Sequence, residues 1–135
     1  MNSLDINVSK TEATIINLNT HRSDNQLPKV KNAINVFENG VHKIVFIHDI
    51  ILIKGESNYS NIILENGRSI FTSRTIKHWT NEINNSKLLR VHKSYLINVE
   101  KIREVNKRSN QILLTENHLV RCSRMVKKYV LNLVN

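Results

Sequence analysis

The stretch that decides the fold is residues 88–98, which read LLRVHKSYLIN. Its apolar residues follow neither the period of a helix nor that of a strand along the whole stretch. Between them lies a compact polar group, namely Arg90, His92, Lys93 and Ser94. Such a segment buries its apolar side chains and holds its hydrogen-bonding side chains at a fixed angle. The pattern predicts a rigid recognition loop on a packed scaffold.

On both sides of this loop the sequence predicts short β-strands. Residues 50–53 read IILI, a continuous apolar run that is typical of a strand buried on both faces. Asn66 and Gly67 form the strongest short hairpin signal in the chain, and Asn39 with Gly40 predicts a second turn. The other expected strands are residues 41–47, 61–64, 68–72, 102–106, 111–115 and 118–122.

Two helices are expected among these strands. Residues 75–84 place Ile76, Trp79 and Ile83 on one face, with Thr72 or Ser73 as the expected cap. Residues 124–133 follow Ser123 and are predicted to form the second helix. Its expected apolar face consists of Met125, Val126, Tyr129, Val130 and Leu133. The sequence therefore predicts a mainly β fold of small antiparallel sheets with two short helices.

The charge of the chain indicates a polyanionic partner. The 135 residues include 20 basic and 11 acidic side chains, which gives a formal net charge of +9. Residues 35–135 contain 16 of the basic and 8 of the acidic side chains. Residues 19–28 are polar and end in the single proline, which is typical of a linker. We expect residues 1–34 to be an N-terminal extension and residues 35–135 to form the binding domain.

Composition argues against several classes of protein. The six histidines show no metal-ligand spacing, and the three glycines form no phosphate-binding loop. We therefore expect no catalytic residue, metal, cofactor or small-molecule substrate. The N-terminus has no signal pattern and no apolar run is long enough to span a membrane, so we expect a soluble cytoplasmic protein without a membrane partner. Cys122, the single cysteine, is expected to be an ordinary buried or half-buried thiol, although Arg121 could lower its pKa.

Three stretches together resemble the LytTR domain, the DNA-binding module of LytR/AlgR-type bacterial transcriptional regulators. They are residues 50–60 (IILIKGESNYS), 89–98 (LRVHKSYLIN) and 120–124 (VRCSR), and the similarity covers residues 35–135. The resemblance implies sequence-specific binding of double-stranded DNA, with loops rather than a recognition helix in successive major grooves. It also implies binding as two copies on repeated half-sites. The middle stretch is the specific one, because the first and third alone are weak.

The resemblance assigns DNA contacts to three loops. The first contains Asn58, Tyr59 and Ser60, the second contains His92, Lys93 and Ser94, and the third contains Ser123 and Arg124. Lys93 stands where the family often has arginine. The chemistry fits, because arginine or lysine can bind the acceptors of guanine and asparagine matches the edge of adenine. Expected phosphate contacts, which position the protein without reading sequence, are Arg74, Arg90, Arg121, Lys127 and Lys128.

Other interpretations remain open from the residues alone. Lys127 and Lys128 could be the solvated face of an amphipathic helix, and Asn58 could be a turn residue. The whole chain could be a protein-interaction module that docks on or antagonises a larger LytTR regulator. An RNA-binding module is a further alternative, but the chain has few aromatic residues for stacking on bases. The 34 residues before the binding domain are too few for the receiver domain that many LytTR proteins have, so phosphorylation control within the chain is not expected.

Overall fold

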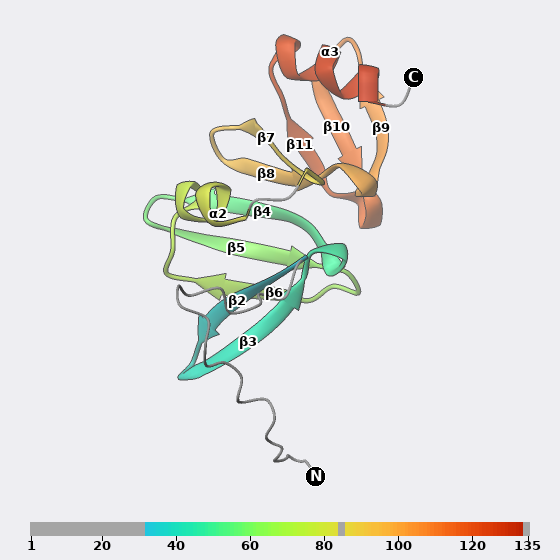
Figure 1. Cartoon of the computed structure of the whole chain (residues 1–135). Coiled ribbons are helices and arrows are strands. Elements are labelled where there is room, and N and C mark those ends of the chain that lie inside the picture. The colour runs from blue at the N-terminus through green and yellow to red at the C-terminus, as the bar shows by residue number, and fades with distance from the viewer. Residues whose placement is uncertain (1–31, 84–85, 134–135) are drawn as a thin grey trace, which may run out of the picture. The chain divides into compact units, whose positions relative to one another are not determined.

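The computed structural model describes residues 32–83 and 86–133 (Figure 1). These residues form a mainly β fold with antiparallel sheets and two α-helices, as predicted. The strands are β2 (Ala33–Glu38), β3 (Val41–Phe46), β4 (Ile50–Glu56), β5 (Tyr59–Leu64), β6 (Ser69–Thr72), β7 (Leu88–His92), β8 (Tyr95–Asn98), β9 (Ile102–Asn106), β10 (Gln111–Leu114) and β11 (Leu119–Arg121). The helices are α2 (Ile76–Glu82) and α3 (Arg124–Leu133), with 3-10 turns η2 (Ile47–Asp49), η3 (Val99–Lys101) and η4 (Thr115–Asn117).

A five-stranded antiparallel sheet lies at the centre, in the order β6-β5-β4-β8-β7. Its middle strand β4 has Ile50, Ile51 and Ile53 fully buried and Leu52 only 3% exposed. This confirms the prediction of a strand covered on both faces. The reason is that each face of the sheet contributes to a different apolar core, and β4 supplies residues to both.

The first core lies against the β2–β3 ribbon and helix α2. Ile50 and Ile53 of β4 pack there with Val36 of β2 and with Ile76 and Trp79 of α2. The helix begins after Thr75, whose side chain accepts a hydrogen bond from the backbone N–H of His78. We expected Thr72 or Ser73 as the cap; the extended backbone of Thr75 shows that the chain turns into the helix later.

The second core lies between the five-stranded sheet and the sheet β11-β10-β9. Ile51 and Leu52 pack there with Ile112 of β10 and Val130 of α3. Helix α3 has the predicted bounds, but it buries a narrower face than expected. Val130 is buried and Val126 half-buried, whereas Met125, Tyr129 and Leu133 are 79%, 54% and 47% exposed. Only the residues of one ridge therefore reach the core.

Tight turns agree with the asparagine–glycine pattern. Asn66 and Gly67 have φ values of 67° and 71°, and Asn39 and Gly40 have values of 53° and 77°. These left-handed conformations suit tight hairpin turns, and asparagine and glycine adopt them at low cost. Strand β2 begins at Ala33, inside the segment that we expected to be an extension. The recognition segment proved to be a hairpin, β7–β8, whose pairing register shifts between Arg90 and His92.

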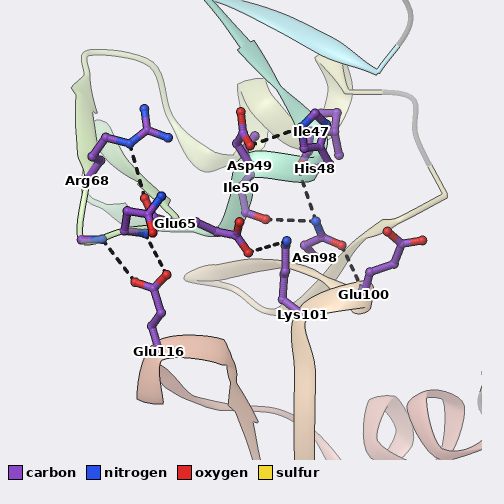
Figure 2. Close-up of polar contacts among 12 residues, drawn as sticks. Ile47, His48, Asp49, Ile50, Glu65, Arg68, Asn98, Glu100, Lys101 and Glu116 are labelled. Atoms are coloured by element: carbon purple, nitrogen blue, oxygen red, sulfur yellow. Dashed lines mark hydrogen bonds and ion pairs between the residues drawn. The ribbon is translucent and has the colours of Figure 1, made fainter.

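Polar ties hold together the end of the molecule that contains the β5–β6 turn (Figure 2). The Glu116 carboxylate accepts hydrogen bonds from the backbone N–H groups of Asn66 (2.8 Å) and Gly67 (3.2 Å). Lys101 Nζ lies 2.5 Å from Glu65 Oε2. The buried Asn98 amide donates to the carbonyls of Ile47 (3.3 Å) and Ile50 (3.0 Å). We call these contacts the tied end; those of Lys101 and Glu116 link residues 99–117 to the turn between β5 and β6.

Candidate nucleic-acid interface

The turn between β7 and β8 presents Lys93 to solvent. Behind it, the guanidinium of Arg90 donates from Nε to the His92 carbonyl (3.0 Å) and from Nη2 to the Lys93 carbonyl (2.6 Å). The backbone N–H of Ser94 donates to His92 Nδ1 at 3.1 Å. His92 and Ser94 are half-buried and share a hydrogen bond within the turn, so Lys93 is its most accessible side chain.

The first predicted loop lies beside this turn. The backbone N–H of Gly55 donates to the carbonyl of Ser94 at 2.9 Å, and Lys54 is the strand partner of Tyr95. The turn at Ser57 and Asn58 therefore lies at the same end of the sheet as the turn that contains Lys93. Figure 1 shows the β4–β5 and β7–β8 turns at this end. Asn58 is exposed.

Ser60 does not lie on this surface. It is fully buried, and its hydroxyl donates to the backbone carbonyl of Arg74 at 2.8 Å. Side chains alternate along β5, so Tyr59 faces solvent where Ser60 faces inward. The ring of Tyr59 is 38% exposed and lies 5.0 Å from that of Phe71. The resemblance had placed Ser60 in the contact loop, and the geometry instead gives it a structural role.

The contact between Ser60 and Arg74 brings a further loop to this end of the sheet. Ser60 pairs with Thr72, the last residue of β6, so residues 73–75 lie next to the start of β5. Arg74 is exposed there. We call the turns at residues 57–58, 73–75 and 93–94 the loop end of the five-stranded sheet. It lies opposite the tied end along β5.

The third predicted loop adjoins the loop end through a shared hollow. A pocket of about 660 Å³ is lined by residues of the β7–β8 hairpin and of the segment that leads into α3. Its lining residues are Arg90, Val91, His92, Lys93, Arg121, Cys122 and Ser123. Two segments separated by about thirty residues in the sequence thus form one concave surface.

The junction between β11 and α3 positions Ser123 and Arg124. The Ser123 hydroxyl oxygen accepts from the backbone N–H of Val126 at 3.1 Å, which caps the helix. Arg124 is the first residue of α3 and is exposed, as are Arg121 before the junction and Lys128 one turn later.

Lys127 and Cys122 have partners inside the fold. Lys127 Nζ donates to the Lys107 carbonyl (2.5 Å) and to Asn110 Oδ1 (2.7 Å), so it ties α3 to the β9–β10 turn. Burial raises the pKa of the Cys122 thiol, and the positive charge of Lys127 opposes this only in part. The lowering by Arg121 that we had considered is therefore not found, and the thiol is protonated at neutral pH.

Five cations at the loop end and the adjoining junction have exposed side chains. They are Arg74, Lys93, Arg121, Arg124 and Lys128, all exposed. Within the described residues, none of these five side chains forms an ion pair or hydrogen bond with another part of the protein. Their guanidinium and ammonium groups remain available to an external anion such as a phosphate.

Two residues that shape this surface were not identified from the sequence. Thr80 accepts a hydrogen bond from Arg90 Nη1 at 3.1 Å, and no sequence signal marks it. A Cβ atom on Gly55 would lie 2.9 Å from Ile76 Cγ2, so glycine allows α2 to approach β4 closely. The sequence did mark this position, because Gly55 is the one glycine of three that does not follow an asparagine.

Within the described ranges, no helix is long and apolar enough to cross a membrane.

Comparison with known proteins places this architecture in a family. Residues 41–135 match the model of the LytTr DNA-binding domain. The fold is similar to the LytTr DNA-binding domain of a protein from Bacillus cereus described as a methyl-accepting/DNA response regulator. The TM-score is 0.63 and the sequence identity 12%, and the match covers 78% of this chain and 99% of that one. No curated protein matches the chain in sequence. No receiver domain is evident in the 135-residue sequence. Because the family model spans most of the chain, the protein belongs to the LytTr DNA-binding domain family.

Proposed function

We propose that the protein is a transcriptional regulator that binds specific sequences in double-stranded DNA by inserting side chains of the loop end and the α3 junction into the major groove. The supporting observation is that three segments far apart in the sequence lie next to one another. Gly55 and Ser94 join the first two by a backbone hydrogen bond, and the shared pocket joins the second to the third. The five free cations on this surface suit a polyanionic duplex.

In this proposal the exposed side chains divide into two groups. Lys93, Arg124 and Asn58 read base edges, because their donors and acceptors match guanine and adenine in the major groove. Arg74, Arg121 and Lys128 bind phosphates and fix the position of the protein on the duplex. Tyr59, His92, Ser94 and Ser123 support these contacts from within the loops. Ser60 and Lys127 are left out of the interface because their polar groups are already engaged.

The protein would act in the bacterial cytoplasm, where its DNA lies, and would bind as two copies on repeated half-sites. A small interface of this kind gains strongly from doubling its contacts, because the second copy binds at a high effective concentration. The binding function needs no metal, cofactor or small-molecule substrate.

The experiment that tests this proposal starts with selection of bound sequences from a random duplex pool. The selected duplex is then titrated by fluorescence anisotropy against scrambled duplex and single-stranded competitors. We expect the selected duplex to bind roughly 10³-fold or more tightly than the scrambled one, as is typical of specific regulators. Equal affinity for all duplexes, or preference for the single strand, would contradict the proposal.

A second candidate function is favoured by an apolar surface elsewhere in the protein. Phe37 and Ile44 on the outer face of the β2–β3 ribbon are 58% and 60% exposed. Such a face suits a protein partner, as expected of a module that docks on a larger LytTR regulator. The double variant Phe37→Ser/Ile44→Ser distinguishes the two: a docking module would lose binding to a larger LytTR regulator in this variant, whereas a DNA-reading protein would keep its affinity for the selected duplex.

A further inference from the structure

We infer that Arg90 is a positioning residue, which fixes the shape of the Lys93 turn from behind rather than contacting DNA itself. The inference rests on the proposed function, because it names the residue that prepares the reading turn. It changes the role that the sequence suggested for Arg90, which was a phosphate contact.

The guanidinium of Arg90 already has three protein partners. Its Nε and Nη2 donate to the successive carbonyls of His92 and Lys93, at 3.0 and 2.6 Å. Its Nη1 donates to Thr80 Oγ1 at 3.1 Å. The side chain is half-buried and is one of the residues that line the shared pocket. These contacts direct the fork of donors toward the turn.

This turn needs such support because the strand pairing is irregular just before it. The register of β7 against β8 shifts between Arg90 and His92, and Val91 is buried in the second core. A planar guanidinium can bridge two adjacent carbonyls with fixed geometry, whereas a lysine ammonium is a single point of charge. Arginine at this position therefore selects one conformation of the His92–Lys93 backbone.

Thr80 extends this support to helix α2. Its hydroxyl donates to the Ile76 carbonyl at 2.8 Å and accepts from Arg90, so its orientation is fixed. On the opposite side, the Gly55 N–H holds the Ser94 carbonyl. The reading turn is thus held from two sides by groups that are not themselves at its exposed tip. Binding groups discriminate best when a second layer of contacts fixes them in this way.

Two substitutions separate positioning from phosphate contact. Arg90→Lys keeps the charge but loses the fork. Thr80→Val removes the hydroxyl that accepts from Arg90 and donates to the Ile76 carbonyl, without changing any charge. We expect each to reduce discrimination between the selected duplex and one mutated at the base read by Lys93, by roughly tenfold for Arg90→Lys and less for Thr80→Val. Affinity for scrambled duplex and its salt dependence should stay unchanged. In the double variant, Thr80→Val should add nothing, because the two residues act through one contact.

Thr115→Val is the matched control, since Thr115 lies in η4 and its hydroxyl is buried without a hydrogen-bond partner in the described structure. It should leave discrimination unchanged. The inference is overturned if Arg90→Lys keeps full discrimination, or if Thr80→Val has no more effect than Thr115→Val.

The protein without DNA provides a separate readout. In ¹⁵N-labelled protein, Arg90→Lys and Thr80→Val should shift the amide signals of residues 92–94 and speed their hydrogen exchange, with the tied end unchanged. If these signals change but wild-type protein binds no duplex selectively, the support exists and the proposed function fails. If selective binding holds but the signals of residues 92–94 stay fixed, the positioning role fails alone.

Discussion

The two ends of the five-stranded sheet differ in what their polar side chains do. At the tied end, Glu116 binds two backbone N–H groups, Lys101 pairs with Glu65, and the Asn98 amide lies buried between two carbonyls. At the loop end, Lys93 and Arg74 are exposed and make no such contacts with described residues. The same strands run through both ends, so the difference comes from the loops rather than from the sheet.

The polar groups that hold the structure together and the polar groups that remain available to a ligand thus lie at opposite ends of the strands. The tied end joins residues 101 and 116, which flank β9 and β10, to the turn between β5 and β6. The loop end can then leave its cations unpaired without loosening the fold. Substitutions at the tied end should lower stability, and those at the loop end should lower binding.

The largest effect is expected for Asn98→Ala at the tied end. The variant removes the hydrogen bonds of the buried Asn98 side chain to the carbonyls of Ile47 and Ile50 and to the backbone N–H of Glu100, so the free energy of unfolding should fall by about 3 kcal/mol. Urea denaturation followed by circular dichroism measures it. The control is Asn106→Ala, because exposed Asn106 also binds two backbone N–H groups, of Arg108 and Ser109. A loss as large for Asn106→Ala would show that burial at the tied end is not the cause.

The next effect concerns the exposed tips. Lys93→Ala and Arg124→Ala should each weaken binding to the selected duplex by about 1–3 kcal/mol and relax the preference at one base position. Neither should change the urea midpoint, because both side chains are exposed and form no hydrogen bond or ion pair with another described residue. Anisotropy titrations with single-base variants of the duplex test this. Loss of stability without loss of base preference would show that the exposed tips serve the structure, as the tied end does, and not DNA binding.

Lys127 and Lys128 show the same difference between structural and available cations within a single helix. Lys128→Ala should weaken all duplexes alike and reduce the slope of log affinity against log salt by about one unit. Lys127→Ala should leave that slope nearly unchanged and lower stability by about 1 kcal/mol, since its ammonium group bonds to Lys107 and Asn110. Salt titrations of both variants distinguish these two roles. Equal slopes would show that the two lysines have the same role.

The smallest effect is the pH dependence of the tied end. Hydrogen bonds from the Asn66 and Gly67 N–H groups hold the pKa of Glu116 below its ordinary value. A lowered pKa stabilises the fold above the pKa of the unfolded state, about 4.5, and this contribution disappears as the pH falls through the folded value. Glu116→Gln should therefore be less stable than wild type at pH 7, and the difference should shrink as the pH falls below about 4.5. Glu104→Gln, at an exposed carboxylate of β9, is the control. A difference that does not shrink as the pH falls would contradict the predicted role of the Glu116 carboxylate.

Much of the fold could be predicted because local signals agreed with the tertiary structure. The apolar run at residues 50–53, the Asn66–Gly67 turn and the bounds of α3 all followed from residue pattern. The exposed part of α3 could not be predicted, because an apolar stripe does not reveal how wide a face its neighbour covers. Met125 and Tyr129 show this most clearly.

The candidate site was predictable only in part, for a physical reason. A sequence motif places Ser60 and Arg90 next to reading residues, but it does not say which way each side chain points. Ser60 turns inward by strand alternation, and Arg90 turns back toward Thr80 on a helix ten residues earlier. Partners brought together by folding, rather than by sequence spacing, decide whether a polar group is free to bind.

Amide chemical-shift changes in ¹⁵N-labelled protein, measured on addition of the selected duplex, test most directly whether the loop end and the α3 junction bind DNA. We expect the largest changes at residues 57–59, 73–75, 92–94 and 121–124, with little change at Asn66, Gly67 and Glu116. Largest changes at the tied end or on the β2–β3 ribbon would contradict this expectation.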